Sequence, residues 1–104
     1  TKDITGIGYS GIGYKTSGVR GVPLAVSESK PFVKANYANV MNGSYPIWRH
    51  LYIYVNKAPN TPVSPLIAQF LTYLYSKDGQ QIVVKDGYFP LSAPDVQEEL
   101  NKLH

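Results

Sequence analysis

The sequence predicts a chain of the α/β fold class, for three reasons. A central stretch at 48–55 is rich in aromatic and branched side chains and is apolar on both alternating faces from Leu51 onward, like a buried strand in a helix-covered sheet. The segments before it carry β-favouring residues between glycines. After it, apolar residues recur at helical spacing in three consecutive segments.

The composition is typical of one small globular domain and excludes several classes of function. Of the 104 residues, 43% are hydrophobic and 16% are charged, which excludes disorder as the main state. The net charge of +3 is scattered along the chain, so nucleic acid is not an expected partner. The absence of cysteine excludes disulfide frameworks, thiolate catalysis and cysteine-based metal sites.

The first segment contains a tandem five-residue echo, GIGYS at 6–10 and GIGYK at 11–15. Isoleucine and tyrosine favour strands and the glycines permit a bulge, so a strand broken by a turn is expected here. A similar strand-like segment follows at 19–26. From 27 to 44 the pattern is irregular, because Pro31 interrupts any helix and the asparagines favour turns.

The clearest helix begins after a loop at 57–62, and Pro65 suits its first turn. Six apolar residues recur there at the spacing of one helical face: Leu66, Ile67, Phe70, Leu71, Leu74 and Tyr75. A second helix is expected from the N-cap Ser76 to a left-handed C-cap at Gly87. A third is expected from Ser92 to Leu103, with Ser92 and Asp95 at capping-box spacing. The residues expected to face inward are Ile82 and Val83 in the second helix and Val96, Leu100 and Leu103 in the third.

A central strand that is apolar on both faces needs paired neighbours, and the helices that follow cannot hydrogen-bond to its edges. Part of the sheet is therefore expected outside this sequence. The first residue, Thr1, is neither an initiator methionine nor part of a leader, so we expect that the natural N-terminus was removed or lies upstream.

The short motifs have simple structural explanations. The glycine pattern at 6–11 matches the dinucleotide fingerprint, but neither the preceding strand nor the following helix is present. Ser10 and Ser17 lack the spacing of a nucleophile elbow. The triplet Asn42-Gly43-Ser44 is a glycosylation sequon by pattern alone. The carboxylates of the helices fit capping and solvation, and none of them forms an acid–base pair.

Neither histidine is expected to ligate a metal or to catalyse a reaction. His104 is terminal, and His50 follows Arg49 with no carboxylate or second histidine nearby in the sequence. We therefore expect a hydrogen-bonded structural role for His50.

Three stretches together resemble the C-terminal portion of bacterial phosphate-binding proteins, the solute receptors of phosphate ABC transporters. They are GIGYSGIGY at 6–14, YPIWRHLYIYV at 45–55 and SKDGQQIVVKDGYFPL at 76–91. The resemblance implies the C-terminal portion of a two-lobed, type II periplasmic-binding-protein fold. It implies that residues 1–44 end the second lobe, that 45–50 cross the hinge, and that 51–104 complete the first lobe.

The implied function is high-affinity capture of inorganic phosphate by lobe closure and delivery to an ABC transporter permease, without catalysis or cofactor. The implied partners are phosphate, the N-terminal segment of the same protein and the membrane permease. The implied location is periplasmic or extracellular, with a lipoprotein anchor as one arrangement. The family's phosphate ligands lie upstream of this region, in hydroxyl, acidic and arginine side chains and an Arg-x-x-x-Ser-Gly-Thr motif.

No residue of this chain takes a ligand position by this resemblance. The segment Thr16-Ser17-Gly18 has the wrong order and place, and Arg20 and Arg49 match no family ligand. We therefore expect no phosphate-binding, catalytic, cofactor or metal residue here. The chain departs from the family where Ile47-Trp48 and His50 replace the usual Leu-Ser and Pro, and the bulk of Trp48 is expected to alter hinge packing.

Two alternatives come from other classes. One is a hydrolase or phosphatase on a similar two-lobed scaffold, with His50 as the base. The other is a stand-alone interaction module that uses the tyrosines as a contact surface, since the chain has nine of them.

Overall fold

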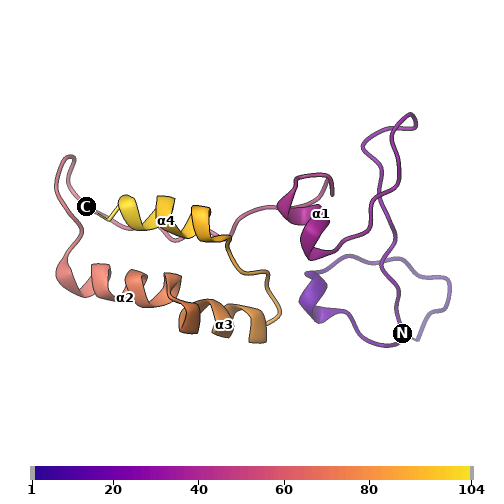
Figure 1. Ribbon diagram of the computed structural model, residues 1–104. Helices are drawn as coiled ribbons and strands as arrows, with labels where there is room; N and C mark the ends of the chain where they lie inside the picture. Colours follow the sequence, from indigo (N-terminus) through magenta and orange to yellow (C-terminus); the bar gives the residue numbers. More distant parts are fainter. Residues whose placement is uncertain (1, 104) are drawn as a thin grey trace. The chain divides into compact units, whose positions relative to one another are not determined.

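The computed structural model describes residues 2–103 and divides into two compact units, with the division between Leu51 and Tyr52. We call them the N-terminal unit and the C-terminal unit. The elements in chain order are the 3₁₀-helix η1 (Ile12–Tyr14) and the α-helices α1 (Tyr37–Met41), α2 (Pro65–Tyr75), α3 (Lys77–Lys85) and α4 (Ala93–Asn101) (Figure 1).

In its described residues the N-terminal unit contains one isolated antiparallel bridge in place of the two predicted strands. Leu24 N donates to Val33 O at 2.9 Å, and Val33 N donates to Leu24 O at 2.7 Å. The second copy of the echo forms η1, so the predicted strand at 6–14 is wrong for this chain. A strand persists only when a neighbour pairs with its backbone along its length, and a single bridge supplies too few bonds.

The region predicted to be irregular, 27–44, contains the short helix α1. Its N-cap is Asn36, whose Oδ1 accepts from Asn39 N at 2.9 Å. Asparagine is among the strongest N-cap residues, so a residue expected to mark a turn here begins a helix. The Asn39 Nδ2 also donates to Lys34 O at 2.9 Å and fixes the approach to α1.

The predicted central strand at 48–55 is also absent from the described residues, where this segment has no regular secondary structure. Most of its side chains are exposed, and Tyr54 is 93% exposed. No described segment forms a ladder with it. Since a ladder needs a second strand, the apolar pattern alone does not produce one here.

The C-terminal unit is built around α2, which contacts both α3 and α4. Pro65 occupies the first turn of α2, as predicted. The buried apolar side chains among residues 2–103 are Val63, just before this helix, and Leu71 within it. After α3 the chain turns back, and α4 runs alongside α2 (Figure 1).

The predicted face of α2 is only partly buried. Leu71 is 5% exposed, and Ile67, Leu74 and Tyr75 are half-buried. Leu66 and Phe70 are instead exposed, by 79% and 58%, and together with Tyr73 they form a second apolar face at positions i, i+4 and i+7. We call Leu66, Phe70 and Tyr73 the outer stripe of α2.

A tight junction joins α2 to α3 at Ser76, which is the C-cap of one helix and the N-cap of the other. Its Oγ accepts from Gly79 N at 3.2 Å, as expected for the predicted N-cap. Gly79 is buried, and a Cβ atom on it would collide with the carbonyl oxygens of Tyr73 and Leu74. The close approach of the two helices therefore requires glycine at this position.

The predicted N-caps of the last two helices and the left-handed Gly87 are confirmed, but α4 ends at Asn101, before the predicted end at Leu103. After α3, Gly87 has a φ of 92°, which is the left-handed region that glycine favours. Ser92 caps α4, with its Oγ accepting from Asp95 N at 3.3 Å and donating to Asp95 Oδ2 at 2.6 Å. Val83, Val96, Leu100 and Leu103 are half-buried, but Ile82 is 54% exposed, so its predicted inward position is wrong.

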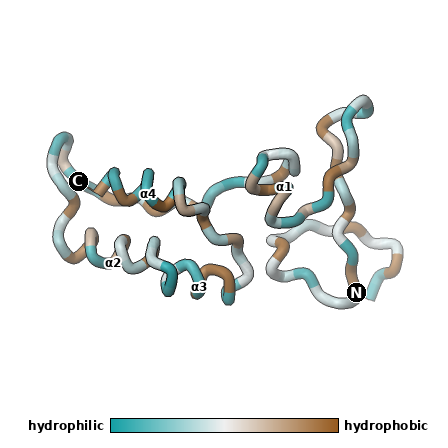
Figure 2. Tube along the Cα trace, viewed as in Figure 1, coloured by the Kyte–Doolittle hydropathy of each residue, from teal (hydrophilic) through white to brown (hydrophobic). Residues whose placement is uncertain are grey.

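Hydrophobic residues recur along the irregular segments as well as along the helices (Figure 2). The described part of the chain contains no helix with the length and apolar character that a membrane span needs.

Candidate functional site

The charged and histidine side chains that sequence analysis considered for chemistry lie at the surface. Arg20, Arg49 and His50 are all exposed in the N-terminal unit. The His50 ring packs edge-on against Trp48, with ring centroids 5.4 Å apart and an interplanar angle of 89°. This geometry is typical of aromatic packing and gives His50 a structural contact.

In the glycine-rich segment the Ser10 hydroxyl contacts the local backbone, and the backbone carbonyl of Thr16 closes a turn. Ser10 Oγ donates to Gly11 O at 3.2 Å, and Thr16 O accepts from Val19 N at 3.3 Å within a turn. Residues 2–103 hold no group of three or more histidine, aspartate or glutamate side chains that could bind a metal ion. The expectation that this chain contributes no phosphate ligand remains a prediction.

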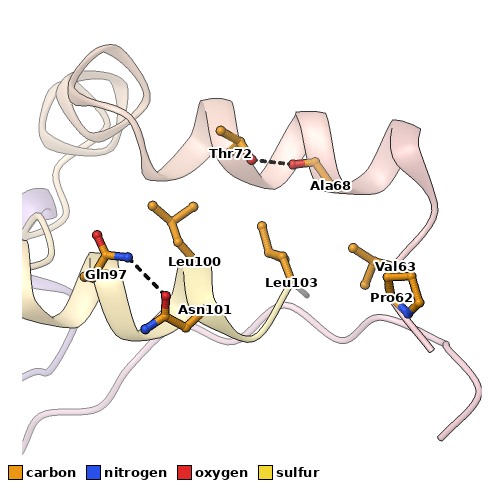
Figure 3. Close-up of a pocket in the computed structure, with 8 residues that line it drawn as sticks. All are labelled: Pro62, Val63, Ala68, Thr72, Gln97, Leu100, Asn101 and Leu103. Atoms are coloured by element: carbon orange, nitrogen blue, oxygen red, sulfur yellow. Dashed lines mark hydrogen bonds between the residues drawn. The ribbon is translucent and has the colours of Figure 1, made fainter. Parts of the chain in front are cut away.

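A groove lies between α2 and α4 in the C-terminal unit, with a volume of about 500 Å³ (Figure 3). Its lining residues are Pro62, Val63, Ala68, Thr72, Gln97, Leu100, Asn101 and Leu103. Leu100 points from α4 toward α2, and Leu103 points the same way from the turn after α4 (Figure 3). The lining includes no charged side chain, so the groove lacks the cations that bind an oxyanion tightly.

The polar atoms of this groove are largely paired with each other or with backbone. Thr72 Oγ1 donates to Ala68 O at 2.7 Å, and Gln97 Nε2 donates to Asn101 Oδ1 at 3.1 Å (Figure 3). These bonds follow the i, i+4 geometry of their helices. The groove is thus a gap between two packed helices, suited to apolar contact.

At the edge of the α2–α4 contact, Glu99 shifts the pKa values of Tyr75 and Lys102. Lys102 Nζ donates to Glu99 Oε1 at 2.7 Å, and this bond raises the pKa of Lys102. Burial raises the pKa of Tyr75 on α2, and the charge of Glu99 raises it further while Lys102 opposes the shift.

In the N-terminal unit, hydrogen bonds from Thr5 lower the pKa of Asp3, which is fully exposed.

The most extensive chemical feature is exposed apolar surface, which both units carry. In the N-terminal unit it includes Ile4, Ile7, Tyr9, Val26, Phe32 and Ile47, and in the C-terminal unit Tyr52, Ile53, Tyr54, Ile82, Val84 and the outer stripe of α2. Covering one large apolar side chain contributes about 1.5–3 kcal/mol. This surface is suited to burial against further protein and not to ligand chemistry.

Three features of the structure were missed by sequence analysis. They are the helix α1, the outer stripe of α2 and the close approach at Gly79. The outer stripe could have been predicted from the sequence. The apolar residues between Leu66 and Tyr75 cover a wider arc of the helix than one packed face needs.

Residues 2–78 match the family model described as PBP superfamily domain. This match covers well over half of the chain, which therefore belongs to the periplasmic-binding-protein superfamily and confirms the resemblance at the family level. The two α/β lobes are not visible in this chain, whose described residues are mainly helical and irregular.

Several curated proteins are similar to this chain along most of its length. The chain is 54% identical over 103 residues to the phosphate-binding protein PstS of two Pseudomonas aeruginosa strains, covering 99% of this chain and 32% of theirs. It is 34% identical over 91 residues to phosphate-binding protein PstS 2 of Streptococcus agalactiae, and 33% over 96 residues to phosphate-binding protein PstS of Bacillus subtilis. These alignments cover 88% and 91% of this chain, and 28% and 29% of the relatives. The chain thus spans about a third of the length of the curated relatives that it matches.

Proposed function

We propose that this chain is the C-terminal part of a receptor that captures inorganic phosphate by lobe closure and delivers it to an ABC transporter permease. The observation that carries the proposal is the 54% identity to phosphate-binding protein PstS along 99% of this chain. Identity at that level along the whole chain supports a common fold and a common ligand class. Closure follows from the ligand binding the closed form more tightly than the open form.

The proposed role of this chain is scaffold and hinge. Residues 1–44 end one lobe, 45–50 cross the hinge, and 51–104 complete the other lobe. The exposed apolar side chains support a larger assembly, because they offer far more apolar surface than the two buried apolar side chains among residues 2–103 conceal. The apolar pattern at 48–55 supports a strand that pairs with protein outside these residues.

The phosphate ligands come from the N-terminal segment of the same protein in this proposal. The groove between α2 and α4 has no charged lining, which supports a ligand site elsewhere. The protein acts without catalysis or cofactor and works in the periplasm or outside the cell, held there in some cases by a lipid anchor.

The test is isothermal titration calorimetry of the full-length protein with inorganic phosphate. We expect saturable heat that sulfate at the same concentration does not reproduce. The chain of 104 residues alone should give no saturable heat. Absence of phosphate binding by the full-length protein contradicts the proposed ligand, and tight binding by this chain alone contradicts the proposed division of roles.

A further inference from the structure

The turn after α1 contains the single Asn-Gly pair of the sequence, Asn42-Gly43. Asn42 is the C-cap of α1, and both residues are exposed. Gly43 has a φ of 77°, and a Cβ atom on it would meet nothing within 4 Å. No side chain therefore shields the backbone nitrogen of Gly43 from the carboxamide of the residue before it.

One hydrogen bond of this turn activates the Asn42 carboxamide, and the other must open before the Gly43 nitrogen can attack. Ser44 N donates to Asn42 Oδ1 at 2.9 Å, which draws electron density from the side-chain carbonyl and makes its carbon more electrophilic. The Gly43 N–H donates to Val40 O at 3.1 Å, in the last turn of a helix of five residues. A helix this short frays at its ends, and each opening frees the Gly43 nitrogen.

We propose that Asn42 is a site of spontaneous covalent modification by the following backbone nitrogen. The deprotonated Gly43 nitrogen attacks Asn42 Cγ, so that an N–Cγ bond forms and the Cγ–Nδ2 bond breaks. The departing amide nitrogen takes up the proton that Gly43 lost and leaves as ammonia. One water molecule then opens the five-membered succinimide, leaving aspartate or isoaspartate at position 42. The step needs no oxidant, reductant, metal ion or enzyme.

Two other asparagines of this helix serve as internal controls. Asn36 Oδ1 accepts from Asn39 N at 2.9 Å, and Asn39 Nδ2 donates to Lys34 O at 2.9 Å, so both carboxamides are held in structural roles. Tyr37 and Val40 follow them, and these side chains crowd the backbone nitrogen that would have to attack. We therefore expect modification at Asn42 and not at Asn36 or Asn39.

The product changes the end of α1 in two ways. It places a negative charge at the helix C-terminus, where the dipole of the helix disfavours it. Isoaspartate also inserts a methylene into the backbone just before the segment at 45–50. This inference goes beyond the proposed function and does not depend on it.

The test is peptide mapping by mass spectrometry of the full-length protein, incubated at mildly alkaline pH. We expect loss of the amide at Asn42, faster as pH rises, with labelling of the same peptide by isoaspartate methyltransferase. Asn36 and Asn39 should keep their amides, and Asn42→Gln should abolish the change, because glutamine would have to form a larger ring. An intact Asn42, or equal conversion at all three asparagines, overturns the proposal.

A second variant separates this chemistry from glycosylation at the same triplet. Ser44→Ala destroys the Asn-x-Ser sequon but keeps the backbone N–H that donates to Asn42 Oδ1. Amide loss should therefore persist in this variant. A modification of Asn42 that disappears with the Ser44 hydroxyl would be enzymatic and would contradict the proposal.

Discussion

Gln80 and Leu91 are joined by a hydrogen bond across eleven residues of sequence, in which Leu91 N donates to Gln80 Oε1 at 2.9 Å. The same carboxamide donates through Nε2 to Leu74 O at 3.0 Å. One side chain on α3 thus pairs with a carbonyl near the end of α2 and with the backbone that leads into α4. Both bonds are partly buried, so the amide links all three helices of the C-terminal unit.

Replacing Gln80 by alanine should lower the free energy of unfolding of the full-length protein by about 1–3 kcal/mol, because two backbone groups lose a partner in a partly buried setting. Gln80→Glu should also destabilise the protein, since it keeps the acceptor for Leu91 N but replaces the donor to Leu74 O with an oxygen. Denaturant unfolding measures both effects, and Gln81→Ala, at the exposed neighbouring position, is the matched control. Equal stabilities of the two alanine variants would contradict the role given to Gln80.

The Gly79→Ala variant distinguishes the effect of helix propensity on stability from the effect of close contact between α2 and α3. In an exposed helix interior this change stabilises by about 1 kcal/mol. Here the new Cβ would collide with the carbonyls of Tyr73 and Leu74, so we expect a loss of about 1–3 kcal/mol. Gly21→Ala is the control, because a Cβ there meets nothing within 4 Å. A stabilised Gly79→Ala protein would show that α2 and α3 do not pack this closely.

The pKa of Tyr75 predicts a loss of stability at alkaline pH. Burial and the charge of Glu99 raise this pKa above the ordinary value of 10.0, so the folded state holds the phenolic proton more tightly than the unfolded state does. The stabilisation that Tyr75 contributes is complete at pH values below the ordinary pKa. It is lost as pH rises through the raised pKa of the folded state. In the Tyr75→Phe variant, the free energy of unfolding should therefore fall less steeply as pH rises through this alkaline range. Tyr73→Phe, on the exposed face of α2, should leave it unchanged.

The outer stripe of α2 tests whether further protein covers this chain. If it does, Phe70→Ser in the full-length protein should lower the free energy of unfolding by about 1.5–3 kcal/mol, the contribution of one buried apolar side chain. Gln69→Ser, at the neighbouring exposed position, should change it by no more than about 0.5 kcal/mol. Similar small effects in the two variants would show that the stripe stays exposed in the complete protein.

A His50→Ala variant distinguishes the proposed receptor function from the hydrolase alternative. A phosphatase assay on the full-length protein should detect no turnover, with or without His50→Ala, because a receptor has no reaction to lose. Loss of the edge-on contact with Trp48 should appear instead as a small decrease in thermal stability. Turnover that depends on His50 would favour the hydrolase.

The accuracy of prediction from sequence varied with the range of the interactions involved. The caps at Ser76 and Ser92 and the left-handed Gly87 were predicted because each depends on residues within a few positions of it. The strand at 48–55 depends on a distant pairing partner, and the described residues do not supply one. Ile82 was misplaced for a similar reason, since helical spacing defines a face but not the neighbour that covers it.

Local backbone chemistry and recognisable motifs were sufficient to predict α2, α3 and α4, the N-caps Ser76 and Ser92, and membership of the periplasmic-binding-protein superfamily. The folded structure was needed to show which face of α2 is buried, why Gly79 must lack a side chain, and how Gln80 joins three segments. Burial and close approach depend on residues brought together by folding, and the periodicity of one segment carries no record of them.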